Sequence, residues 1–68
     1  MRIEVHIHPS GVDRSVELPA PARGIDLLTA LDLAPDAHIL VRAETPLPED
    51  EALLEGDRIR VVAVVSGG

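Results

Sequence analysis

The chain has 68 residues, a formal net charge of −6 at pH 7 and a hydrophobic fraction of 46%, with neither aromatic residues nor Cys. The missing Cys excludes disulfides, thiolate metal sites and thiol nucleophiles. The acidic charge and the missing aromatic rings argue against nucleic acids, and the charge also argues against anionic membrane surfaces. We therefore expect one small cytoplasmic domain with an aliphatic core, without a signal peptide or a membrane span.

The N-terminal segment has the pattern of a β-hairpin. Residues 2–8 alternate strictly between β-branched residues and charged or polar residues, which indicates a half-buried strand. Turn-forming residues follow at 9–11, and residues 12–18 are expected to form a second strand.

A change of period after the hairpin predicts one helix. Pro19 and Pro21 end the second strand because proline cannot donate to a β-ladder. Between residues 23 and 33 the apolar residues recur at helical spacing, opposite acidic residues. The sequence Ala34-Pro35-Asp36 is expected to stop this helix.

Two further strands are expected before the acidic loop. Residues 38–42 have the composition of a strand, and we expect Ile39 and Val41 to face inward and Leu40 to face outward. Residues 45–48 are expected to form a very short strand, which their prolines would confine to an edge.

The C-terminal third consists of an acidic turn, a strand and a tail. Residues 49–55 are acidic, and their apolar residues 52–54 are expected to pack inward. Residues 58–65 form the most strongly β-favouring segment, with Val65 among its inward residues. Residues 66–68, Ser-Gly-Gly, follow as a flexible tail.

The order of these elements predicts an α+β fold. A hairpin followed by a helix favours a mixed four- to five-stranded sheet with the helix packed across it. The first and last strands are expected to pair in parallel, because the helix supplies the right-handed crossover that such a pair needs. This is the β-grasp, or ubiquitin-like, arrangement, with one domain at 1–65 and a tail at 66–68.

The residues also resemble a known family. The strand order, the chain length, the segment Leu54-Glu-Gly-Asp-Arg-Ile-Arg-Val-Val and the ending Val65-Ser-Gly-Gly are similar to those of ubiquitin-like sulfur carriers. These include the thiamine-biosynthesis carrier and the small subunit of molybdopterin synthase. Leu33-Ala-Pro-Asp and Leu47-Pro-Glu-Asp give the chain its likeness to the small archaeal modifier proteins and their counterparts in thermophilic bacteria.

The resemblance implies that the chain is a substrate of enzymes rather than an enzyme. An E1-like enzyme that uses ATP and Mg would adenylate the carboxylate of Gly68. The product would become a thiocarboxylate, with a rhodanese or cysteine desulfurase as sulfur donor, or an isopeptide on a lysine of a target protein. The thiocarboxylate would serve transfer-RNA thiolation, molybdopterin or thiamine synthesis. The chain itself would bind no cofactor and would be a monomer.

The tail has a composition that suits threading into a narrow enzyme channel. Five extended residues from Val64 onward span roughly 16 Å. Gly67 and Gly68 lack a Cβ that would crowd the channel walls, and Ser66 completes the tail.

An exposed apolar patch next to the tail would bind the activating enzyme. With the facing expected above, Leu40, Val62 and Val64 share the outer side of the sheet. Such a patch is typical of a protein–protein contact, although scattered apolar residues on a surface are also common.

Other polar groups are assigned no chemistry. His6 and His8 lie two residues apart on one strand face, but with no Cys we expect a solvated face and no metal site. The acidic run at 49–51 is expected to be a solvated turn. All six basic residues are Arg, so chains linked through Lys are excluded and only the α-amino group of Met1 could accept a second copy.

Two alternative functions remain open at this point. The chain could be a non-catalytic β-grasp binding module that uses its sheet surface and ignores its terminus. It could also be the accessory subunit of a synthase, with its tail inserted into a larger catalytic chain.

Overall fold

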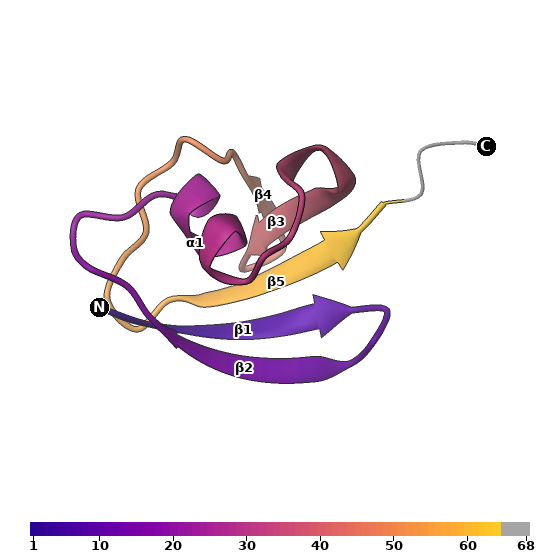
Figure 1. Ribbon diagram of the computed structural model, residues 1–68, viewed down its shortest axis with the longest axis horizontal. Coiled ribbons are helices and arrows are strands. Elements are labelled where there is room, and N and C mark those ends of the chain that lie inside the picture. The colour runs from indigo at the N-terminus through magenta and orange to yellow at the C-terminus, as the bar shows by residue number, and fades with distance from the viewer. Residues whose placement is uncertain (65–68) are drawn as a thin grey trace.

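The computed structural model describes residues 1–64 and contains a five-stranded sheet with one α-helix (Figure 1). The strands and helices, in chain order, are β1 Arg2–His8, β2 Val12–Glu17, α1 Gly24–Ala30, the 3₁₀ turn η1 Pro35–Ala37, β3 His38–Arg42, β4 Thr45–Leu47 and β5 Arg58–Ala63. The predicted strands are confirmed, and their ends differ by two residues at most. The expected positions of Val65 and of the tail at 66–68 lie outside the described residues.

The last strand occupies the middle of the sheet. The strand order is β2-β1-β5-β3-β4, with β5 parallel to β1 and antiparallel to β3 (Figure 1). The parallel pairing sets Val5 opposite Ile59 and Ile7 opposite Val61. The expected pairing of the first and last strands is therefore confirmed.

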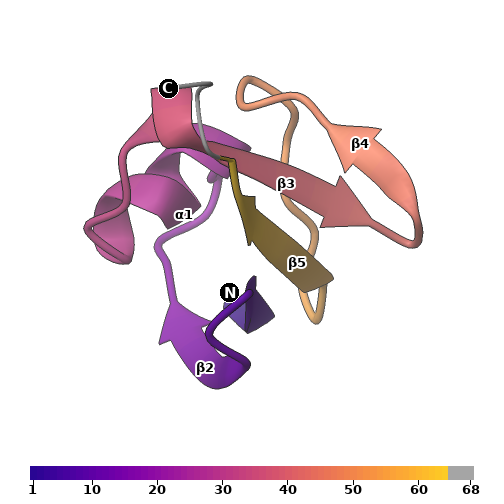
Figure 2. The same cartoon turned by 90° about the vertical axis from the view of Figure 1, so that its right-hand side faces the viewer.

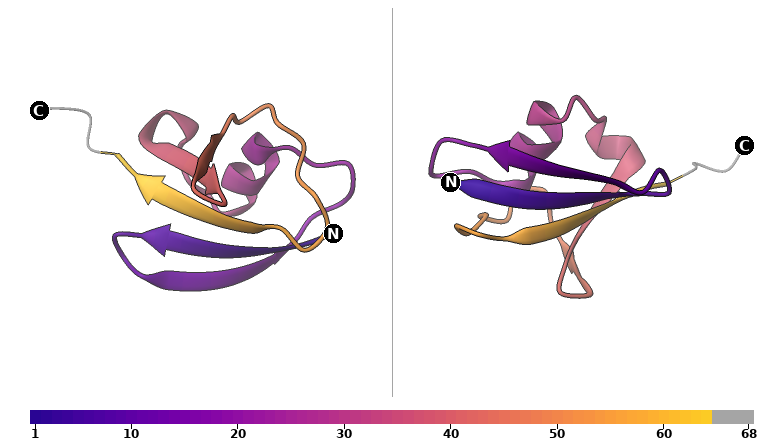
Figure 3. Two further views of the ribbon diagram at one scale, coloured as in Figure 1. Left: turned by 180° about the vertical axis from the view of Figure 1, so that it is seen from behind. Right: turned by 90° about the horizontal axis from the view of Figure 1, so that it is seen from below.

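The helix α1 covers one face of the sheet, and the opposite face carries no helix within residues 1–64 (Figures 2 and 3). We call this uncovered side the open face. The core between α1 and the sheet is entirely aliphatic. Its buried residues are Ile3, Val5, Leu18, Ala22, Leu27, Leu28, Leu40, Leu47, Leu53, Ile59 and Val61. α1 has seven residues, and no helix in the described part of the chain is long and apolar enough to cross a membrane.

The helix is shorter than the sequence predicted, because a left-handed residue ends it. Asp32 has φ 59°, and its amide donates to the carbonyl of Thr29 at 3.1 Å. The amide of Leu33 donates to the carbonyl of Leu28 at 2.9 Å. These two bonds form a Schellman motif, which stops α1 at Ala30 before the Pro35 that was expected to stop it.

The predicted facing of β3 is wrong. Leu40 is only 2% exposed and lies opposite Val61 and Leu47, which are both buried. Ile39 is 46% exposed and faces the other way. Directly opposed residues of a sheet share a face, so the buried Val61 places Leu40 in the core. The prediction for residues 52–54 is also wrong in part, because Leu53 is buried while Ala52 and Leu54 are exposed.

Candidate functional site

The residues that lead to the C-terminal end belong to β5, a strand that is hydrogen-bonded to a neighbour on each side. β5 pairs with β1 along one edge and with β3 along the other. Beyond the strand, the amide of Val64 donates to the carbonyl of Ala37 at 2.9 Å. The direction of the chain is therefore fixed as far as Val64. The predicted tail residues Ser66, Gly67 and Gly68 follow it in sequence but lie outside the described residues.

Apolar side chains gather on the open face next to this end of β5. Val62 is half-buried and lies opposite Ile39 on β3 and opposite His8 on β1. Val64 is exposed, two residues further on. We call Ile39, Val62 and Val64 the open-face patch. The patch contains two of the three predicted docking residues, with Ile39 in place of the buried Leu40.

Ile39 was missed because its strand has apolar residues at three consecutive positions, 39 to 41. In such a run, strand alternation allows either Leu40 alone or both Ile39 and Val41 to face inward. The choice between phases comes from pairing with β5, where the strict alternation of Arg58, Ile59, Arg60 and Val61 leaves only one arrangement that buries the apolar residues.

Two arginines lie on the same face of β5, between the start of the strand and the patch. Arg58 and Arg60 alternate with the buried Ile59 and Val61 and are exposed. No carboxylate within residues 1–64 lies within ion-pair distance of either guanidinium. They border a shallow hollow of about 570 Å³ on the open face. Residues that line the hollow include Glu4, His6, Asp13, Val41, Arg58 and Arg60.

The two histidines lie on the open face of β1. Nδ1 of His6 lies 2.5 Å from Oδ1 of Asp13 on β2, and the rings of His6 and His8 meet edge to face with centroids 4.5 Å apart. Over residues 1–64, no three His, Asp or Glu side chains are grouped closely enough to hold a metal ion. His6 therefore acts as a cross-strand partner of Asp13 in the hairpin.

The arrangement suits recognition of another protein. Apolar side chains flanked by guanidinium groups provide both hydrophobic contact and charge-assisted hydrogen bonds. The five-stranded mixed sheet, with its last strand in the middle and one helix packed across it, defines a ubiquitin-like β-grasp protein.

The sequence places the chain in one family of this class. The family description "Small archaeal modifier protein 2" matches residues 1–65, so the chain belongs to that family. Its members are small modifier proteins rather than enzymes. A comparison with curated proteins gives no match.

Solved structures agree with the fold. The crystal structure of SAMP1 from Haloferax volcanii is similar at a TM-score of 0.77 and 20% identity, and all of both chains is covered. The structure of ATBAG1 in complex with HSP70 is similar at a TM-score of 0.81 and 8% identity. It covers 97% of this chain and 41% of that one. At these identities the structural likeness confirms the β-grasp fold alone.

Proposed function

We propose that the chain is a ubiquitin-like modifier and sulfur carrier that acts through the carboxylate of Gly68. The observation that supports this proposal is membership of the small archaeal modifier family over residues 1–65, followed directly by Ser66-Gly67-Gly68. A binding module that does not use its C-terminal residues would not need the Gly-Gly sequence.

The proposed activation is an acyl transfer. A carboxylate oxygen of Gly68 attacks the α-phosphate of ATP on an E1-like enzyme, and pyrophosphate leaves. A lysine amine of a target protein then attacks the acyl carbon, which forms an isopeptide and releases AMP. Alternatively, a persulfide from a rhodanese or a cysteine desulfurase attacks the same carbon and releases AMP. A thiol then cleaves the resulting acyl disulfide and leaves the thiocarboxylate.

Removal of Gly67 and Gly68 tests the proposal. The shortened chain is expected to release no pyrophosphate from ATP with the activating enzyme, because the reacting carbon no longer reaches the α-phosphate. Its thermal unfolding is expected to match that of the full chain, since the core residues all precede position 62. Undiminished pyrophosphate release by the shortened chain would overturn the proposal.

The open-face patch is proposed to bind the activating enzyme. It lies beside the end of β5, where a bound enzyme would receive the tail, and it exposes Ile39 and Val64. Val62→Asp is expected to weaken binding at least tenfold by placing a carboxylate in the contact, a loss of about 1.4 kcal/mol or more. Val12→Asp is the matched control, because Val12 is exposed on β2 and lies outside the patch. Equal binding by the two variants, measured by calorimetry, would remove the patch from the interface.

A further inference from the structure

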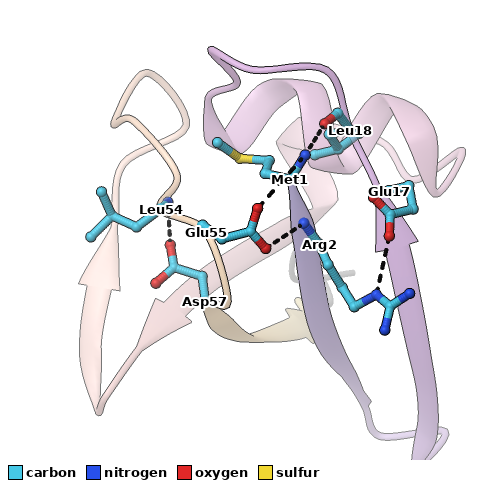
Figure 4. Close-up of polar contacts among 7 residues, drawn as sticks. All are labelled: Met1, Arg2, Glu17, Leu18, Leu54, Glu55 and Asp57. Carbon is cyan, nitrogen blue, oxygen red and sulfur yellow. Dashed lines mark hydrogen bonds and ion pairs between the residues drawn. The ribbon is translucent and has the colours of Figure 1, made fainter.

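The acids on the open face of the β1–β2 hairpin each have a partner inside the hairpin. The three pairs are Arg2 with Glu17 at 3.1 Å (Figure 4), His6 with Asp13 at 2.5 Å and Ser15 with Glu4 at 2.9 Å. Glu4 also lies opposite Arg58 on β5 in the parallel ladder. Its carboxylate nevertheless accepts a hydrogen bond from Ser15 on β2, which leaves the neighbouring guanidinium without it.

Arg58 and Arg60 therefore carry charge that the hairpin does not balance. No carboxylate within residues 1–64 lies within ion-pair distance of either side chain. Both are exposed, and both border the hollow of the open face. The chain as a whole has a net charge of −6, so these two cations stand apart from its acidic remainder. Guanidinium groups form strong and often paired hydrogen bonds with carboxylates, so this part of the face favours an acidic ligand.

Apolar side chains continue from the two arginines. Val62 follows Arg60 by two residues on β5 and lies on the same face. On β3, Val41 lies opposite Arg60 and Ile39 lies opposite Val62. Ile39 is exposed, while Val41 and Val62 are half-buried. Along β5, the open face therefore presents two guanidinium groups and then an apolar contact.

The spacing along β5 restricts the shape of a ligand. Residues two apart in a strand point to the same side and are separated by about 7 Å. An extended segment of another protein repeats with the same period, so acids at alternate positions would each meet one guanidinium. In a helix, residues two apart do not face the same side. Because β1 and β3 already use the backbone groups of β5, such a segment would lie across the face and bind through its side chains.

We propose that the open face binds an extended acidic segment of a partner protein, with carboxylates at two alternate positions and an apolar residue two positions further, in either chain direction. Arg58 and Arg60 donate hydrogen bonds to the carboxylates, and the apolar residue contacts Ile39, Val41 and Val62. A nucleic acid fits this face less well, because the net charge of the chain repels phosphates and no aromatic residue is present for stacking on bases. Binding of this kind does not depend on any reaction at the C-terminus.

A synthetic peptide with this pattern, acetyl-Ile-Thr-Glu-Thr-Glu-Thr-Ile-amide, is the probe, and the full chain is titrated with it by NMR. The control peptide, acetyl-Ile-Thr-Thr-Glu-Glu-Thr-Ile-amide, has the same composition and charge, but its adjacent acids point to opposite sides of an extended chain. We expect the probe to shift amide signals of β3 and β5 and to bind about threefold more tightly than the control, the effect of one exposed ion pair. Equal affinities of the two peptides would overturn the proposal. Tighter binding of a short oligouridine of the same net charge would overturn it in favour of a nucleic acid.

Two variants of the chain separate the arginine pair from net charge. Arg60→Gln is expected to weaken binding of the probe about threefold or more. Arg14→Gln is the matched control, because it removes the same charge from an exposed residue of β2 that lies opposite Val5, on the helix side of the sheet. Both variants should unfold at the temperature of the native chain, since both side chains are exposed. Equal losses of affinity in the two variants would contradict the proposal. The titrations contain no activating enzyme, so their outcome is separate from that of the proposed function.

Discussion

Asp57 connects the turn before β5 to β3 through one carboxylate oxygen. Its Oδ2 accepts hydrogen bonds from Nη2 of Arg42 at 2.6 Å and from the amide of Leu54 at 2.8 Å. The same Nη2 donates to the carbonyl of Ala52 at 3.0 Å. The Asp57 side chain is 11% exposed, so the pair is largely shielded from water. Loss of the acid would leave a partly buried guanidinium without its counter-charge.

We expect Asp57→Ala to lower the free energy of unfolding by about 2–4 kcal/mol, measured by urea denaturation at pH 7. Glu17→Ala is the control, because the Arg2–Glu17 pair is exposed at both ends and should contribute less than about 1 kcal/mol. Similar losses in the two variants would contradict the role given to Asp57.

Gly24 begins α1 at a point where the helix lies against the sheet. A Cβ on this residue would lie 2.6 Å from Cδ1 of Leu40 and 3.2 Å from the Cα of Glu49. Ala usually stabilises a helix relative to Gly by about 1 kcal/mol. The close approach predicts that Ala at position 24 instead lowers the stability of the protein.

Gly24→Ala is therefore expected to lower stability by about 1–3 kcal/mol in urea denaturation, because Leu40 must shift within a packed core. Thr29→Ala, at an exposed position of the same helix, should change stability by less than about 1 kcal/mol. A more stable Gly24→Ala chain would show that the space beside Gly24 is larger than the structure indicates.

At the scale of elements, the sequence predicted β1 completely and the side chains of β3 incorrectly. β1 alternates between apolar and polar residues, so its inward face follows from its own pattern. β3 reads His-Ile-Leu-Val-Arg, and only the ladder to β5 and β4 decides that Leu40 is buried. The end of α1 was also missed, because Asp in the left-handed conformation gives a weaker signal than Gly.

The facing of β3 can be tested with two truncations. Leu40→Ala is expected to cost about 2–5 kcal/mol of stability, as for a buried leucine. Ile39→Ala should cost less than about 1 kcal/mol in the same urea titration but should weaken binding of the activating enzyme, because Ile39 belongs to the open-face patch. A larger loss of stability for Ile39→Ala than for Leu40→Ala would instead support the facing predicted from the sequence, with Ile39 inward and Leu40 outward.

At the scale of the whole molecule, the fold and the family were predictable, and the contacts of single residues were not. The parallel pairing of the first and last strands follows from the order of the elements and the handedness of crossovers. The site was predicted in part, since Val62 and Val64 lie beside the end of the central strand while Leu40 lies in the core. The ion pair of Arg42 with Asp57 joins segments far apart in the sequence, and no local pattern indicates it.

Recognition of a partner and the proposed chemistry are assigned to different parts of the molecule. The open face offers apolar and guanidinium groups to a partner, on the strand that leads to the proposed reactive end of the chain. We propose that the reactive group is the carboxylate of Gly68, which follows β5 in the chain. Intact mass spectrometry of the full chain, incubated with the activating enzyme, ATP and a persulfide sulfur source, tests this directly. We expect the mass gain of one oxygen replaced by sulfur at Gly68. A chain of unchanged mass, under conditions where a known carrier is converted, would contradict the proposed role of Gly68.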